Sequence, residues 1–141
     1  MEPIDVSRLP PDALIVMDSA PIIYFLEGHP KYGGRFEPVF ESHAAGNVRF
    51  AVTTITIAEV LTGPIGAGEE TLARRYRSIL ESWQVINMDA DIAESAARMR
   101  ALFRLKLADA VQVASAIAIN ADALVTHDRD FSRVTRLNVI S

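Results

Sequence analysis

Four acidic side chains stand at positions where a catalytic centre could form. Asp18 directly follows one apolar run, and Asp128 lies two residues beyond another. Glu59 lies shortly after a third run, and Asp109 is the one charged residue within 107–121. Clustered carboxylates repel one another, a divalent cation relieves that repulsion, and oxygen ligands suit Mg²⁺ or Mn²⁺. Such a centre could polarise a phosphoryl oxygen and activate water for attack on phosphorus.

Each of these acids also has an ordinary structural role open to it. Asp18 suits the N-cap of a following helix, and Asp128 suits an Asx turn. Glu59 stands three residues after Thr56, which is the spacing of a capping box. Asp109 would interact favourably with the start of its own helix. Taken singly, these roles are the commoner outcome for an acid at such a position.

Asp109 is the residue that favours a shared site. It lies in a segment whose apolar composition indicates a buried helix, and a buried carboxylate without a partner is costly. Arg104 and Lys106 are the basic residues near it in the sequence that could pair with it instead.

Short apolar runs alternate with helical patterns along the chain. The predicted strands are 14–17, 50–53, 85–86, 123–126 and 137–140. The predicted helices are 21–26, 36–43, 56–62 (ended by Gly63 and Pro64), 69–83, 89–104 and 107–120. The runs do not alternate between apolar and polar residues, as expected when both faces of a sheet are covered. We therefore expect an α/β fold, a three-layer sandwich around a mainly parallel five-stranded sheet, with the acids in the crevice beyond the carboxyl ends of the strands.

Composition narrows the class of protein. The 141 residues are 50% hydrophobic and 23% charged, which predicts one globular domain over 14–141, preceded by a proline-containing arm over 1–13. The absence of cysteine excludes disulfides and thiolate zinc sites. No apolar segment reaches the roughly 20 residues of a membrane span, and the start does not look like a signal peptide, so the expected location is cytoplasmic. A net charge of −4 argues against a basic protein that coats nucleic acid.

Four segments together resemble the PIN-domain family of metal-dependent ribonucleases, and within it the VapC-type toxins of prokaryotic toxin–antitoxin systems. They are 15–19 (IVMDS), 52–60 (VTTITIAEV), 107–114 (LADAVQVA) and 124–131 (LVTHDRDF). Each segment alone is weakly specific, but all four occur in the family's order and spacing. The resemblance covers the chain from Leu14 onward. It implies a PIN-like fold and hydrolysis of RNA phosphodiester bonds.

The resemblance also implies roles for the acids. Asp18 and Asp109 match the usual direct metal ligands, with Mg²⁺ or Mn²⁺ as the ion. Glu59 and Asp128 match the acids that complete the metal or water shell, so all four count as catalytic. Other matching positions are Ser19 and Thr126, as supporting hydroxyls, and Asp130, as a structural member of its motif. His127 departs from the family, which often has Asn there.

Family resemblance further implies partners: an RNA substrate, a homodimer, and a small antitoxin that places a basic side chain among the carboxylates. Phosphate contacts would have to come from a local arginine patch, because the rest of the chain is balanced in charge. The candidates are Arg35, Arg74, Arg75, Arg98 and Arg104.

Other functions remain open on the sequence alone. The leading alternative is a non-enzymatic PIN-like module that binds RNA or protein. A haloacid-dehalogenase-type phosphatase would need a second Asp where Ala20 stands, and a receiver domain would need a lysine later than Lys106. A dinucleotide-binding enzyme would need a G-x-G-x-x-G motif after the first strand, which the chain lacks.

Overall fold

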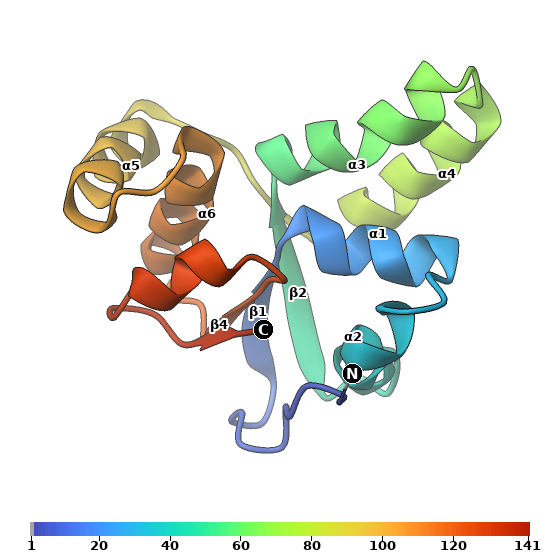
Figure 1. Ribbon diagram of the computed structural model, residues 1–141, viewed down its shortest axis with the longest axis horizontal. Helices are drawn as coiled ribbons and strands as arrows, with labels where there is room; N and C mark the ends of the chain where they lie inside the picture. The colour runs from blue at the N-terminus through green and yellow to red at the C-terminus, as the bar shows by residue number, and fades with distance from the viewer. Residues whose placement is uncertain (1) are drawn as a thin grey trace.

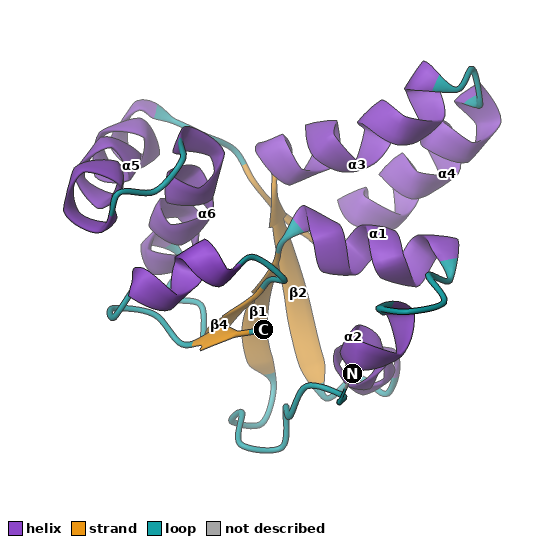
Figure 2. Ribbon diagram, in the orientation of Figure 1, coloured by secondary structure: helices purple, strands orange, loops and turns teal. Residues whose placement is uncertain are grey.

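A computed structural model describes residues 2–141 as three layers, with a sheet between two groups of helices (Figure 1). The strands are β1 (Ala13–Met17), β2 (Val48–Thr53), β3 (Gln84–Ile86), β4 (Ala123–Val125) and β5 (Val139–Ile140). The helices are α1 (Ser19–Glu27), α2 (Gly33–Ala44), α3 (Thr54–Gly66), α4 (Glu70–Glu81), α5 (Ala90–Phe103) and α6 (Leu107–Ala118), with a short 3-10 helix at Arg129–Arg133. Figure 2 shows α1 to α4 on one side of the strands and α5 and α6 on the other.

The sheet has the order β3-β2-β1-β4-β5, and every strand pairing in the described chain is parallel. The expected α/β sandwich with five strands is therefore confirmed. Parallel pairing brings the carboxyl ends of the strands to one edge, where Met17 of β1 pairs with Val125 of β4. Figure 1 shows α1 and α3 leaving the sheet at this edge.

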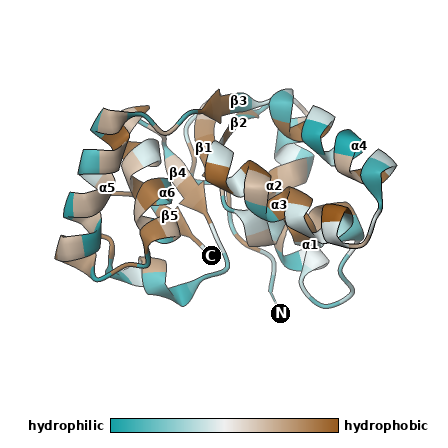
Figure 3. Cartoon of the chain, turned by 90° about the horizontal axis from the view of Figure 1, so that it is seen from above, coloured by the Kyte–Doolittle hydropathy of each residue, from teal (hydrophilic) through white to brown (hydrophobic). Residues whose placement is uncertain are grey.

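Both faces of the sheet are buried, which explains why the strands are apolar throughout. In β1, Leu14 and Val16 pack in a core with α5 and α6, whereas Ala13, Ile15 and Met17 pack in a second core with α1 and α2. The strands are brown in the hydropathy view of Figure 3, and the outer helix α4 carries teal stretches. Alternation along a strand therefore divides one set of apolar residues between two cores.

The start and end of α3 differ from the prediction. Thr53, the last residue of β2, is the N-cap, and its Oγ1 accepts a hydrogen bond from the backbone N of Thr56 at 3.1 Å. The alternative role considered for Glu59, a capping box with Thr56, is therefore excluded, because the chain turns from strand to helix within one residue. The helix also continues past Gly63 and Pro64 to Gly66, so the hydrogen bond that this proline cannot donate is lost only in the last turn.

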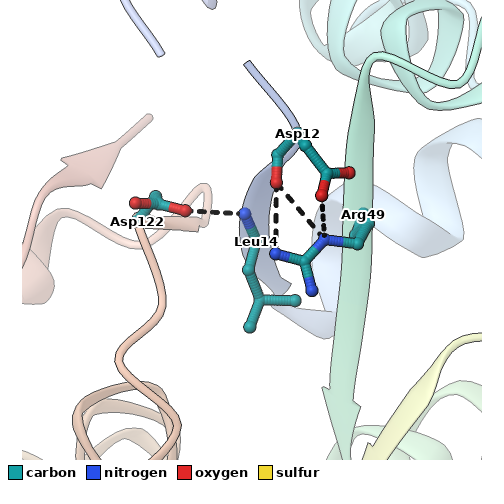
Figure 4. A network of polar contacts seen from close by, with 4 residues as sticks. All are labelled: Asp12, Leu14, Arg49 and Asp122. Atoms are coloured by element: carbon teal, nitrogen blue, oxygen red, sulfur yellow. Dashed lines mark hydrogen bonds and ion pairs between the residues drawn. The ribbon is translucent and has the colours of Figure 1, made fainter. Parts of the chain in front are cut away.

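The opposite edge of the sheet is fastened by acidic side chains (Figure 4). An Asp122 carboxylate oxygen accepts a hydrogen bond from the backbone N of Leu14 at 2.8 Å. Arg49 forms an ion pair with Asp12 at 3.1 Å. These contacts bind the start of β1 to β2 and to the segment before β4, so this edge serves the fold.

The segment before β1 packs on the domain. Ile4 is buried in the core with α1 and α2, and its backbone N donates to the Arg35 carbonyl at 2.9 Å. The Arg35 guanidinium donates to the carbonyl oxygens of Glu2 and Ser141, near the two ends of the chain. Within residues 2–141, no helix has the length and apolarity needed to cross a membrane.

Candidate active site

A cleft of about 340 Å³ opens at the edge where the strands end. Its lining includes all four predicted acids, Asp18, Glu59, Asp109 and Asp128. The other lining residues are Ser19, Ala20, Tyr24, Lys106, Ala108 and His127. Residues separated by more than a hundred positions thus meet in one cleft, as the parallel sheet predicts.

Asp18 is the most tightly held of these acids. It is buried, and it caps α1 by accepting a hydrogen bond from the Ser19 backbone N at 2.9 Å. The Gln112 amide donates to Oδ1 at 3.0 Å, and the Thr126 hydroxyl donates to Oδ2 at 2.8 Å. The capping role and the site role therefore coexist, and three donors fix the orientation of the carboxylate.

Gln112 is the site residue that sequence reasoning missed. This buried amide of α6 donates to Thr56 Oγ1 at 2.7 Å as well as to Asp18, and its Oε1 accepts from Thr53 Oγ1 at 2.6 Å. It thereby joins β1, α3 and α6 behind the cleft. The available signal was an amide inside an otherwise apolar helix, three residues after Asp109 and so on the same helix face.

A second group of carboxylates surrounds Asp109. One ligand oxygen from each of Asp109, Asp128 and Asp130 lies within 4.8 Å of the others. Asp128 forms the expected Asx turn by accepting from the Asp130 backbone N at 2.8 Å. Asp130, predicted to be structural, forms an ion pair with Arg133 at 3.5 Å and also belongs to this group.

Burial and neighbouring carboxylates raise the pKa values of two acids in the cleft. Burial, followed by the charges of Asp128 and Asp18, raises the pKa of Asp109 to about 6, and Lys106 opposes the shift. Burial and the charge of Asp18 also raise the pKa of Glu59. Asp109 Oδ2 is buried without a hydrogen-bond partner among residues 2–141. Crowded carboxylates with an orphaned oxygen fit a hard divalent cation, which prefers oxygen ligands and relieves the repulsion.

Lys106 is the lysine in the described lining of the cleft, and none of the five candidate arginines belongs to that lining. Arg35 holds the ends of the chain, and Arg98 forms an ion pair with Glu94 at 3.3 Å on α5. Burial, followed by the charges of Arg35 and Arg129, lowers the pKa of His127, so both arginines lie near this wall of the cleft.

Comparison with known families decides what kind of domain this is. The PIN domain family matches residues 15–137, which is nearly the whole chain. The chain belongs to the PIN-domain family. The acidic cleft described above is thus the cleft of a PIN domain. Comparison with curated proteins gives no significant match.

Solved structures similar to this PIN domain include chains of toxin–antitoxin complexes and a toxin. A chain of a toxin–antitoxin complex from Klebsiella pneumoniae is 25% identical with a TM-score of 0.71, over 90% of this chain and 96% of that one. A chain of VapBC2 from Rickettsia felis, bound to a promoter DNA fragment, is 20% identical with a TM-score of 0.70, over 89% and 96%. VapC20 of Mycobacterium tuberculosis, described as a sarcin-ricin loop cleaving toxin, is 17% identical with a TM-score of 0.68, over 84% and 92%. The expected resemblance to VapC-type structures is confirmed.

Proposed function

We propose that this PIN domain is a metal-dependent endoribonuclease and the toxin of a toxin–antitoxin pair. The observation that carries the proposal is the cleft that Asp18, Glu59, Asp109 and Asp128 line together, in which Asp109 has an orphaned carboxylate oxygen. The similar structures support the toxin role, because they include chains of toxin–antitoxin complexes and a toxin described as cleaving RNA. Family membership supports the nuclease activity.

The acids would divide the chemistry between them. Asp18 and Asp109 are the proposed ligands for Mg²⁺ or Mn²⁺, with Asp128 beside them. A bound ion of this type would supply charge neutralisation at the scissile phosphate and a water of lowered pKa. Glu59 and Asp128 would orient the attacking water and take up its proton at a carboxylate oxygen. Gln112 and Thr126 would keep both oxygens of Asp18 in place.

This chemistry predicts the ends of the product. Water attacks phosphorus in line and the 3′ oxygen leaves, so the products carry a 5′-phosphate and a 3′-hydroxyl. The 2′-hydroxyl takes no part as a nucleophile. A 2′,3′-cyclic phosphate on the product would contradict the mechanism.

The same cleft would receive the antitoxin. A basic side chain from a partner protein would find several acceptors there, including the orphaned Oδ2 of Asp109, and would form charge-assisted hydrogen bonds. Such a contact would compete directly with metal. We also propose a homodimer and action in the cytoplasm, on structured RNA such as tRNA or rRNA.

The test is cleavage of labelled tRNA and rRNA by the purified chain, free of any partner. We expect cutting in Mg²⁺ or Mn²⁺, none in EDTA, and a loss of roughly 10²-fold or more in Asp109→Asn. Asp91→Asn is the matched control, because Asp91 is an exposed acid of α5 outside the cleft. Cutting that survives EDTA and Asp109→Asn would contradict the proposal. Absence of both cutting and any metal effect on stability would favour the non-enzymatic binding module.

A further inference from the structure

We propose that the His127 ring is a stacking platform for an unpaired nucleobase next to the scissile phosphate. This inference rests on the proposed ribonuclease function and names a subsite of the same cleft. His127 lies in the loop between β4 and the 3-10 helix, and it lines the cleft together with Tyr24, Asp18 and Asp128. A base held here would therefore lie beside the carboxylates.

The His127 ring is held firmly in one orientation. The Tyr24 hydroxyl and His127 Nδ1 form a hydrogen bond of 2.9 Å. Three rings surround the imidazole: Tyr32 with centroids 4.7 Å apart, Tyr24 at 5.4 Å and Phe36 at 5.6 Å. A platform that is already ordered loses little conformational entropy when a ligand stacks on it.

No aromatic ring of the described chain is stacked parallel on the His127 ring. The interplanar angles to Tyr24, Tyr32 and Phe36 are 79°, 59° and 74°, so none of these rings lies parallel to the imidazole. His43 shows the contrast, because it lies at 4° to Phe50 with centroids 4.0 Å apart and its stacking position is taken. Phe36 is fully buried, so core packing alone explains its position. His127 is only half-buried and lies in a cleft.

The surroundings suit single-stranded RNA. Proteins recognise unpaired bases by stacking them on aromatic side chains, histidine included, while cations contact the backbone. The chain has two lysines, and both lie near this region. Lys106 lines the cleft, and Lys31 Nζ lies 5.1 Å from the ring centroid of Tyr32. The backbone phosphates next to a stacked base would thus have cations near them.

The experiment measures stacking in the Asp109→Asn background, so that RNA is bound and not cut. The probes are short single-stranded RNAs with 2-aminopurine at each position in turn, whose fluorescence is quenched by stacking. We expect quenching at one position. His127→Ala should abolish it and weaken binding roughly 5- to 150-fold, the range for loss of a base–aromatic stack. His127→Phe, which keeps a flat ring, should retain both, and His43→Ala should change neither.

A second arm changes the RNA instead of the protein and then combines that change with His127→Ala. Replacing the quenched nucleotide by an abasic one should weaken binding by a similar factor, and the effect should vanish in His127→Ala, since the two changes remove the same contact. Absence of quenching with the natural His127, or equal binding by His127→Ala, overturns the inference. Metal-dependent cleavage by the natural chain tests the ribonuclease separately, so the two failures are distinguishable.

Discussion

Asp109 lowers the stability of the free domain, because its carboxylate is buried near other carboxylates. Its Oδ2 is buried without a partner in the described chain, and two further carboxylates have oxygens within 4.8 Å. Folding brings these charges together, so the ionised cluster destabilises the free protein. A divalent cation or a basic side chain from a partner removes the cost. The residue that weakens the free domain is thus the one that we propose as a ligand for the cation.

We predict that Asp109→Asn stabilises the metal-free protein at neutral pH. The pKa of Asp109 is raised from 3.8 to about 6, so the folded state binds the proton more tightly than the unfolded state. The stability this provides is complete below about pH 4 and is lost as the pH rises through 6. The Asn variant avoids the loss, and we expect a gain of roughly 1–2 kcal/mol at pH 7, discounted for partial exposure.

The measurement is denaturant unfolding in EDTA at pH 5 and pH 7, with Asp91→Asn as the exposed control. The gain from Asp109→Asn should be larger at pH 7. Mg²⁺ or Mn²⁺ should raise the Tm of the natural chain at pH 7, less at pH 5, and little in Asp109→Asn. Equal stability of Asp109→Asn and the natural chain at both pH values would refute the repulsion argument.

At the scale of elements, α6 packs in the core and also carries two polar residues that shape the cleft. It carries Asp109 in its first turn and Gln112 three residues later, and Gln112 binds Asp18 after β1 and two threonines at the start of α3. One amide therefore sets the position of α6 relative to two of the other elements that supply acids. Ser115, one turn further on, is equally buried, but its hydroxyl has no partner among residues 2–141.

We predict opposite effects for two substitutions in α6. Gln112→Met keeps the volume but leaves buried hydroxyls of Thr53 and Thr56 short of partners, and we expect a loss of about 1–3 kcal/mol in the free energy of unfolding. Ser115→Ala removes an unpartnered hydroxyl and should be neutral or stabilising. Denaturant unfolding measures both changes.

A metal titration shows whether Gln112 positions Asp18 for metal binding or only stabilises the fold. Gln112→Met should also weaken Mn²⁺ binding to the folded protein, because Asp18 loses one of its three donors, whereas Ser115→Ala should not. Unchanged metal affinity in folded Gln112→Met would show that the amide only supports the core.

At the scale of the whole molecule, Arg35 joins the two ends of the chain. Its side chain donates to the carbonyl oxygens of Glu2 and Ser141, and its own carbonyl accepts from Ile4. Figure 1 shows the N mark beside α2 and the C mark over the strands. Arg35, one of the candidate residues for phosphate binding, thus has a structural role.

We predict that Arg35→Met loosens both ends of the chain. The free energy of unfolding should fall by about 1 kcal/mol, since the two charged hydrogen bonds are exposed to solvent. Limited proteolysis should cut the segment before β1 faster than in the natural chain. Arg98→Met removes an exposed ion pair of α5 and should change stability by less than about 0.5 kcal/mol. Equal rates of proteolysis in the natural chain and in Arg35→Met would contradict this role of Arg35 in holding the two ends.

The sequence by itself determined the layers of this protein and the place of its acids. Apolar runs without alternation require a sheet covered on both faces, and parallel strands carry their carboxyl ends to one edge. Asp18 and Asp128 could be assigned to that edge because they closely follow strands. Glu59 and Asp109 were candidates from their places after an apolar run and within an apolar helix, and the structure also places both in the cleft.

Only the tertiary structure decided how these acids are held and what faces them. Gln112 meets Asp18 across 94 positions, and Tyr24 meets His127 across 103. Hydropathy periodicity reports neighbours within a turn or a strand, so it carries no information on such pairs. The same reason explains the structural use of Arg35, which meets Glu2 and Ser141 across 33 and 106 positions. Which side chains share a cleft follows from topology, but which atoms bond within it follows from packing.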